Sequence, residues 1–230
     1  MIFFINNNTM RRIFTMSSQD SSGFDVIKES HKLSGDPDEL AQYYQQWADR
    51  YDDDVSKEEY AGPDYIADYF EAMQKKSDRG NRDIKILDAG CGSGLVGITL
   101  YRKEYRDIDG CDLSHEMVSL AEKTDCYQKV VGGVDLNDMS SFHDKEYDAV
   151  ISCGVFTLGH VPPQALNELI RITKSGGLIV LSTRTSYYES SGFHEFCDSL
   201  EEQKLLKILD HRIGPYIAEE DAHYWAFIVP

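Results

Sequence analysis

Short apolar runs alternate with stretches of helical spacing along most of the chain after residue 84. The first run, residues 84–87, leads into three glycines at alternate positions, Gly90, Gly92 and Gly94. Beyond them, apolar residues recur at the spacing of an amphipathic helix. A strand that enters a helix through a glycine turn exposes backbone N–H groups beside the positive end of the helix dipole. This stretch therefore predicts a turn that binds a nucleotide-like ligand.

The rest of the chain repeats the alternation of strand and helix, which predicts a parallel sheet. One helix is expected to begin after Ser114, a residue suited to cap it, and another at Pro162. The remaining strands, including one that closes the chain, are expected at residues 108–112, 127–131, 147–152, 178–182, 207–213 and 224–229.

The segment before the sheet divides into a polar tail and two aromatic helices. Residues 1–35 are rich in serine and asparagine and lack periodicity, so a disordered tail is expected there. Asp36 and Pro37 then form a favourable helix start, and the acidic run 52–54, followed by Gly62 and Pro63, is expected to separate the two helices. We predict one domain after the tail, over residues 36–230. It would consist of a helical cap, residues 36–80, and a Rossmann-like core, residues 81–230.

The chain is strongly acidic, with 23 Lys and Arg residues against 40 Asp and Glu residues and a formal net charge of −17. A nucleic-acid partner requires a basic stripe, and the sequence contains none that we can identify. The acidic balance is therefore interpreted as a means of remaining soluble.

The five cysteines indicate a reducing compartment. Their number is odd, they form no C-x-x-C pair, and no histidine lies at zinc-ligand spacing, so neither disulfides nor a metal site is predicted. No apolar run approaches the roughly 18 residues that span a bilayer. We expect a cytoplasmic protein without a membrane partner, although Arg11 and Arg12 leave a transit peptide open.

Two registers of the glycine turn compete. In the first, Gly92–Gly97 matches the dinucleotide-binding pattern G-x-G-x-x-G, and Asp112 follows at the distance of its ribose-binding acid. That register buries the carboxylate of Asp88 inside a strand, which is unfavourable. In the second, Asp88 ends the strand, the three alternate glycines make the turn, and Gly97 only packs on the helix. A carboxylate at that place attracts a cationic ligand and repels a pyrophosphate, which favours the second register.

Asp112 ends the second expected strand, and its two carboxylate oxygens suit the two hydroxyls of a ribose. A ligand with a ribose and a positive end but no phosphate fits S-adenosylmethionine. We expect Leu113 and Met117 to flank its adenine, and Asp135 and Leu136 to lie at the polar edge of the adenine. The alternative for Asp112 is a role as a helix-capping acid.

Four segments together resemble the class I S-adenosylmethionine-dependent methyltransferases: Asp88–Gly94, Gly110–Ser114, Tyr147–Val150 and Thr173–Gly177. This resemblance implies an α/β, Rossmann-like fold with a seven-stranded, mostly parallel sheet of order 3-2-1-4-5-7-6. Its last strand is antiparallel and helices cover both faces. Residues 36–230 would then form the methyltransferase domain. One departure is Ser175, where the family usually has proline, and little functional effect is expected from it.

More narrowly, the chain resembles the methyltransferase-like proteins named for the Williams–Beuren syndrome chromosome region. The shared residues are Gly94–Val96, Gly159–Pro162 and Thr183–Thr185.

The glycine turn is expected to hold the cofactor through Gly90, Cys91, Gly92 and Gly94. Cys153, which follows the fourth strand, is expected to line the site. We do not predict it to be a nucleophile, because nothing near it in the sequence would lower its pKa.

The helical cap is expected to close over the cofactor, as the resemblance implies. Tyr51 or Arg50 would then lie near the methionine carboxylate, which the planar fork of an arginine matches. Tyr43, Trp47 and Arg50 are the candidates for contact with the methyl acceptor. The alternative for the aromatic residues of this helix is that they pack in the cap.

Methyl transfer from a sulfonium is an in-line displacement, which depends mainly on alignment of the nucleophile and exclusion of water. An oxygen acceptor would also need a base. His160 is the candidate, with a loop histidine that packs or caps the next helix as the alternative. His223 and Tyr51 are weaker candidates for the base.

These features predict a methyltransferase that uses S-adenosylmethionine and acts on a small molecule, with protein methylation as a second substrate class. Residues 152–155 lack the Asn/Asp-Pro-Pro-aromatic motif of enzymes that methylate adenine bases or glutamine amides, which argues against nucleic acid. Two rival functions are a non-catalytic protein that binds S-adenosylmethionine and acts through a partner, and an NAD-dependent oxidoreductase. The oligomeric state is not assigned.

Overall fold

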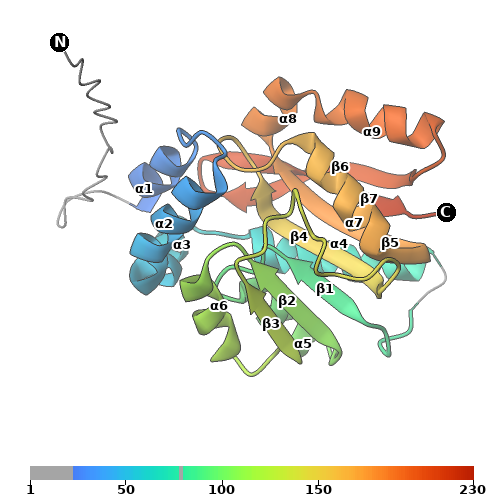
Figure 1. The fold of residues 1–230 in the computed structure, drawn as a ribbon, viewed down its shortest axis with the longest axis horizontal. Helices are drawn as coiled ribbons and strands as arrows, with labels where there is room; N and C mark the ends of the chain where they lie inside the picture. The colour runs from blue at the N-terminus through green and yellow to red at the C-terminus, as the bar shows by residue number, and fades with distance from the viewer. Residues whose placement is uncertain (1–22, 78–79) are drawn as a thin grey trace, which may run out of the picture.

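A computed structural model describes residues 23–77 and 80–230, and within them seven strands form one sheet (Figure 1). The strand order is β3-β2-β1-β4-β5-β7-β6, and β7 runs antiparallel to both of its neighbours. This confirms the predicted fold class, strand order and reversed last strand. The strands are β1 (Ile86–Ala89), β2 (Ile108–Asp112), β3 (Lys129–Gly132), β4 (Tyr147–Phe156), β5 (Thr173–Arg184), β6 (Lys207–Ile217) and β7 (Glu220–Ile228).

The described helices are α1 (Gly23–Ser30), α2 (Pro37–Trp47), α3 (Tyr51–Lys57), α4 (Gly62–Lys76), α5 (Leu95–Arg102), α6 (His115–Glu122), α7 (Leu166–Ile172), α8 (Thr185–Ser191) and α9 (Phe193–Glu202), with 3-10 turns η1 (Ala48–Arg50) and η2 (Pro163–Ala165). Two helices begin as predicted. Asp36 caps α2 by accepting a hydrogen bond from the Glu39 N–H, and Ser114 caps α6 through the Met117 N–H. Within the part of the chain that the structure describes, no helix combines the length and the apolar character needed to cross a bilayer.

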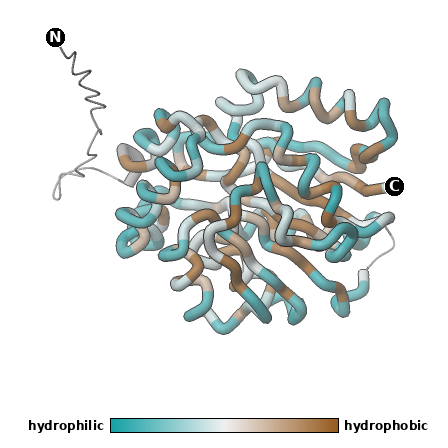
Figure 2. The backbone as a smooth tube through the Cα atoms, viewed as in Figure 1, coloured by the Kyte–Doolittle hydropathy of each residue, from teal (hydrophilic) through white to brown (hydrophobic). Residues whose placement is uncertain are grey.

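Both faces of the sheet are buried, which explains why its strands appear in the sequence as continuous apolar runs. Successive side chains of a strand point to opposite faces. Ile86 and Ile151 accordingly join one hydrophobic core, and Leu87 and Val150 join the other. Helices α4 and α5 cover the first face, and α7 and α9 cover the second. Figure 2 shows apolar strands in the centre and more polar helices outside.

The structure differs from the predicted disordered tail over its second part, where residues 23–30 form α1. Val26 and Leu33 are buried in the same core as Leu40, and the Tyr43 hydroxyl donates a hydrogen bond of 2.5 Å to the Val26 carbonyl. These tertiary contacts stabilise a helix that the polar composition of the segment does not indicate. The first 22 residues, with the leader and the arginine pair, lie outside the described residues.

The acidic run 52–54 also differs from the prediction, because it lies inside α3 and does not separate helices. Asp54 is buried there and accepts a hydrogen bond of 3.0 Å from the indole N–H of Trp47. A buried indole N–H needs an acceptor, and this carboxylate supplies it. The run thus joins α3 to α2 across the short η1 turn.

Candidate active site

The glycine turn after β1 has the backbone that its sequence predicts. Gly90, Gly92 and Gly94 all have positive φ angles, of 77°, 53° and 99°. A side chain at Gly90 would also lie 2.2 Å from the nearer methyl carbon of Val155. At Gly92, by contrast, an added Cβ would meet no atom within 4 Å, so open space lies above the turn. Gly94 is the cap residue of α5.

Asp88 lies one residue before the end of β1, close to the predicted position, but its side chain is fully buried and not exposed to a ligand as expected. The Tyr127 hydroxyl donates a hydrogen bond of 2.7 Å to Oδ2 of Asp88, while Oδ1 has no partner among the described residues. Burial raises the pKa of Asp88 to about 7. The carboxylate supports the turn from beneath and does not line the cavity described below.

Tyr127 reaches Asp88 because three glycines, Gly94, Gly97 and Gly110, leave room for its ring. A Cβ on Gly97 would lie 2.2 Å from Cζ of the Tyr127 ring, and one on Gly110 or Gly94 would lie about 3.1 to 3.2 Å from other ring carbons. The Gly97 N–H also donates to the Tyr127 hydroxyl over 3.2 Å. Gly97 is therefore a position of α5 where the Tyr127 ring packs closely against the helix, as the second register predicted.

Asp112 lies at the end of β2 and connects the turn to the next helix. Its Oδ2 accepts a hydrogen bond of 2.9 Å from the Gly92 N–H, and its Oδ1 accepts one of 2.9 Å from the Ser114 N–H. Burial raises its pKa, against the effect of these hydrogen bonds. Asp112 also lines the cavity, so the capping and ligand-facing alternatives are combined in one residue. The Leu113 N–H also stabilises the carboxylate, whose two oxygens together have four lone pairs, so it can still accept from a ligand.

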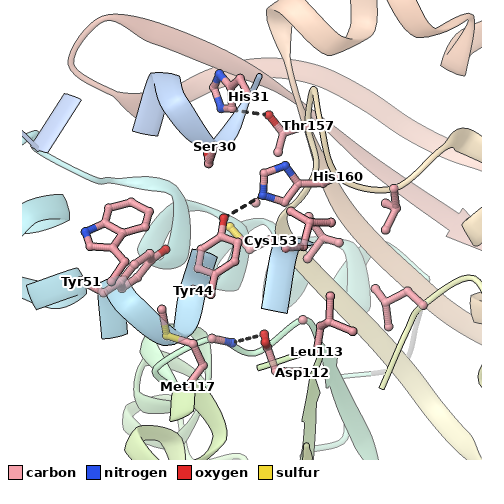
Figure 3. Close-up of a pocket in the computed structure, with 18 of the residues that line it drawn as sticks. Ser30, His31, Tyr44, Tyr51, Asp112, Leu113, Met117, Cys153, Thr157 and His160 are labelled. Atoms are coloured by element: carbon pink, nitrogen blue, oxygen red, sulfur yellow. Dashed lines mark hydrogen bonds between the residues drawn. The ribbon is translucent and has the colours of Figure 1, made fainter. Parts of the chain in front are cut away.

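One cavity lies toward the carboxyl ends of β1, β2 and β4, beside α2 and α3 (Figure 3). It encloses about 1090 Å³, counted out to its open mouth. Parallel sheets of this kind bind their ligands at that edge. Trp47 and His160 line the cavity, as do most residues predicted to bind the cofactor: Tyr51, Gly90, Gly92, Asp112, Leu113, Met117, Asp135, Leu136 and Cys153.

The other predicted site residues lie elsewhere. Cys91 lines a smaller pocket that adjoins the cavity along the glycine turn. Tyr43 is buried in the cap, where its hydroxyl bonds the backbone of α1, so for this residue the packing alternative holds. Arg50 is exposed at the end of η1. Asp88 and Gly94 support the turn without lining the cavity.

His160 and Tyr44 form a hydrogen-bonded pair inside the cavity (Figure 3). The Leu158 carbonyl can only accept, so the Nδ1 of His160, 2.9 Å away, carries the hydrogen. The Nε2 then presents a lone pair, to which the Tyr44 hydroxyl donates over 2.7 Å. Burial lowers the pKa of His160 to about 4. The imidazole is therefore neutral at physiological pH.

A second polar group in the cavity is centred on Arg184, which is 5% exposed at the end of β5. Its Nε donates to Oε2 of Glu220 over 2.8 Å, and its Nη1 donates to Nε2 of His31 over 3.0 Å. The Thr157 hydroxyl lies 3.3 Å from the same His31 nitrogen. Burial is the main cause that lowers the pKa of His31 to about 4, and the positive charge of Arg184 adds to it.

A third group surrounds Cys153, which lines the cavity as predicted. The Tyr60 hydroxyl lies 3.6 Å from Sγ of Cys153 and 3.3 Å from the Tyr216 hydroxyl. Burial raises the pKa of Cys153 to about 12, so the residue remains a thiol and is not an activated nucleophile.

Sequence reasoning missed several of these cavity residues. His31 was assigned to the tail, and Tyr44 was interpreted only as part of an aromatic helix face. Arg184 lies in a segment that carried the family resemblance, which was the one signal available for it. Tyr60 and Tyr216 come from segments far apart in the chain and lacked any motif.

The comparisons with known proteins agree with this geometry. Residues 87–181 match the family model described as a methyltransferase domain. The chain is 33% identical over 174 residues to human methyltransferase-like protein 27, covering 74% of this chain and 69% of that protein. It is 32% identical over 100 residues to a malonyl-[acyl-carrier protein] O-methyltransferase of Pectobacterium atrosepticum, covering 44% of this chain but 38% of that enzyme. The narrower Williams–Beuren resemblance stays a prediction.

The fold is shared with a solved structure, the TehB-like SAM-dependent methyltransferase from Corynebacterium glutamicum. The match has a TM-score of 0.58 at 22% identity and covers 82% of this chain and 99% of that one. Sequence relatedness, sheet order and the glycine turn thus lead to one assignment. The chain belongs to the class I S-adenosylmethionine-dependent methyltransferases, and S-adenosylmethionine is its expected cofactor.

Proposed function

We propose that this protein transfers a methyl group from S-adenosylmethionine to a small-molecule acceptor by in-line displacement inside the cavity. The observation that carries the proposal is the composition of that cavity. It joins the glycine turn and Asp112 at one end to the His160–Tyr44 pair and a buried arginine at the other. One cavity thus brings the residues for a cofactor and those for an acceptor together.

The residues at the first end fit the cofactor. The open backbone above Gly92 leaves room for a ligand in close contact, and the Asp112 carboxylate can still accept from the ribose. We assign the flanks of the adenine to Leu113 and Met117, and its polar edge to Asp135 and Leu136, all of which line the cavity. When bound, S-adenosylmethionine supplies a methyl group activated on a sulfonium.

At the second end, His160 would orient the acceptor. Its Nε2 lone pair is held toward the cavity by the bond from Nδ1 to the Leu158 carbonyl, and an acceptor hydroxyl would replace Tyr44 as its donor. A base with a pKa of about 4 is weak, so it takes a proton only from an acidic group. We therefore assign His160 to positioning, with proton transfer restricted to acidic acceptors.

A small acceptor is favoured over a macromolecule. The walls of the cavity are mainly aromatic and apolar with a few polar groups, as in sites for small molecules. The charge of −17 argues against nucleic acid. The Pectobacterium relative is an O-methyltransferase, which supports an oxygen acceptor here. The five free thiols support the cytoplasmic location that we propose.

Two measurements test the proposal. Thermal shift with S-adenosylmethionine, S-adenosylhomocysteine and NAD should show stabilisation by the first two, and stabilisation by NAD alone would indicate an oxidoreductase. Transfer of labelled methyl from S-adenosylmethionine in a cell extract should then label the small-molecule fraction. Label confined to protein would contradict the small acceptor, and persistent absence of label would favour a non-catalytic binding protein.

A further inference from the structure

Arg184 is the single lysine or arginine among the described residues that line the cavity. A guanidinium is permanently charged and costly to bury without partners. Its position is rigid, because Nε and Nη2 both contact Oε2 of Glu220, at 2.8 and 2.5 Å. Glu220 is held in turn by the Ser186 N–H, which donates to its Oε1 over 2.7 Å. The charge is thus fixed in orientation at the wall of the acceptor end.

Part of this guanidinium remains available to a ligand. Of its five N–H groups, two are directed to Glu220 and one to His31, which leaves one on each terminal nitrogen. The partner in the cavity is weak, because His31 accepts through a neutral imidazole. A charged acceptor makes a hydrogen bond roughly twice as strong as a neutral one, so it would displace His31 from the guanidinium.

Thr157 adds a second donor beside the arginine, since its hydroxyl lies 3.3 Å from Nε2 of His31 and is free to rotate. Figure 3 shows His31 and Thr157 on the far side of His160 and Tyr44 from Asp112. The group is therefore well separated from the residues assigned to the ribose. The walls near it include Leu40 and Val161 and aromatic rings, which suit an apolar ligand body.

We propose that Arg184, with Thr157 and His31, binds a carboxylate carried by the methyl acceptor, which is thus a small and otherwise largely apolar acid. The inference rests on the methyltransfer function proposed above and names its substrate class. A carboxylate is preferred to a phosphate on charge. Glu220 already offsets one unit of charge, so a single arginine suits a monoanion better than a group that carries −1.5 to −2.

Calorimetry on the full chain saturated with S-adenosylhomocysteine tests the inference, with phenylacetate, phenylacetamide and phenyl phosphate as probes. Phenylacetate should bind at least ~10-fold more tightly than the amide, which has the same shape but no charge, and more tightly than the phosphate. Failure to bind phenylacetate, or equal affinity for the acid and the amide, would overturn the proposal. Tighter binding of phenyl phosphate than of phenylacetate would overturn the carboxylate assignment and indicate a phosphate-bearing acceptor.

The variants are chosen so that the fold is preserved. Arg184→Met combined with Glu220→Gln removes both charges of the buried pair, so no unpaired ion is left. It should reduce phenylacetate affinity to the level of the amide, whereas Arg184→Lys should keep part of the preference. Arg212→Gln, an exposed arginine outside the cavity, is the control and should bind like the parent. Retained phenylacetate affinity in the double variant would overturn the proposal.

The same titrations separate this inference from the function on which it rests. Each variant is first titrated with S-adenosylhomocysteine, whose binding should not change with Arg184. If the parent protein did not bind S-adenosylhomocysteine, the methyltransfer proposal itself would be wrong. If the parent protein bound S-adenosylhomocysteine but did not prefer phenylacetate to phenylacetamide, only the assignment of the acceptor as an acid would be wrong.

Discussion

At the scale of single residues, Asp112 has two functions that one substitution can separate. It holds the Gly92 and Ser114 N–H groups and can still accept from a ligand in the cavity. Asp112→Asn keeps the size but loses the charge and one acceptor oxygen. We expect the free energy of unfolding to fall by about 1 kcal/mol, and affinity for S-adenosylhomocysteine by at least ~10-fold in calorimetry.

Asp138→Asn is a matched control for that change, because Asp138 is exposed and outside the cavity and bonds only a local N–H. It should leave the affinity unchanged. An Asp112→Asn protein that binds as tightly as the parent would remove Asp112 from the ribose site.

The buried carboxyl group of Asp88 should make the stability of the protein depend on pH. Its pKa is raised from 3.8 to about 7 by burial, so the folded state keeps a proton that the unfolded chain has lost between these values. Stability from this group therefore falls as pH rises from about 4 to 7, by a total on the order of a few kcal/mol. Asp88→Asn cannot titrate. Urea unfolding at pH 5 and pH 8 should show a smaller loss of stability in the variant than in the parent, and equal losses would disprove the assignment.

The site was predicted unevenly at this scale, for a physical reason. Asp112 ends β2, and Leu113 and Met117 come within the next five residues, so their place at the sheet edge is a local consequence of the sequence. Arg184 and His31 meet across 153 positions, and no local pattern encodes such a contact. The burial of Asp88 was not predicted because the hydroxyl that makes it tolerable comes from Tyr127, on another segment.

At the scale of elements, α5 and the glycine turn depend on how closely Tyr127 approaches them. Gly97→Ala should be destabilising, although alanine favours helices, because its Cβ would lie 2.2 Å from the Tyr127 ring. We expect a loss of about 1–3 kcal/mol in urea unfolding, the usual cost of overpacking. Gly80→Ala, where an added Cβ meets nothing within 4 Å, is the control. Unchanged stability in Gly97→Ala would mean that the ring moves aside at little cost.

Elements with strong local signals were predicted, and elements that depend on tertiary contact were not. The strands appeared as apolar runs because both faces of the sheet are covered. Helix α1 escaped notice because its few apolar residues become significant only against the cap. The loop after α1 also packs closely against the loop that contains Gly159. A Cβ on Gly35 would lie 2.9 Å from the His160 carbonyl oxygen, and one on Gly159 would lie 2.8 Å from the Leu33 carbonyl oxygen.

At the scale of the whole molecule, the strand order was known only through the resemblance to methyltransferases. Hydrophobic periodicity predicts strands but not their neighbours, since every strand of a covered sheet has the same apolar pattern. The parallel pairing of β1 with β2, and the crossover that places β4 parallel to β1 on its other side, bring the carboxyl ends of these three strands to one edge. The cavity is a consequence of that order.

The molecule as a whole should be sensitive to acid through its partly buried histidines. Burial lowers the pKa of His31, His160 and His211 from 6.5 to about 4. Between these values the unfolded chain binds protons that the folded protein does not, so this contribution to stability falls as pH falls from 6.5 to 4. It opposes the contribution of Asp88, which grows over the same range. Burial also lowers the pKa of His223 and raises that of Asp112, so four shifted histidines oppose two shifted carboxyl groups, and we expect a net loss of stability on acidification.

A triple variant tests that balance. Substitution of His31, His160 and His211 by glutamine removes three of the four shifted histidines, so His223 alone opposes the two carboxyl groups. The midpoint of thermal unfolding should then fall less between pH 6.5 and pH 4.5 than it does in the parent. His143→Gln, at an exposed position, should follow the parent curve. If the triple variant lost as much stability as the parent over this range, the acid sensitivity would have to come from other groups, and these three histidines would not be its source.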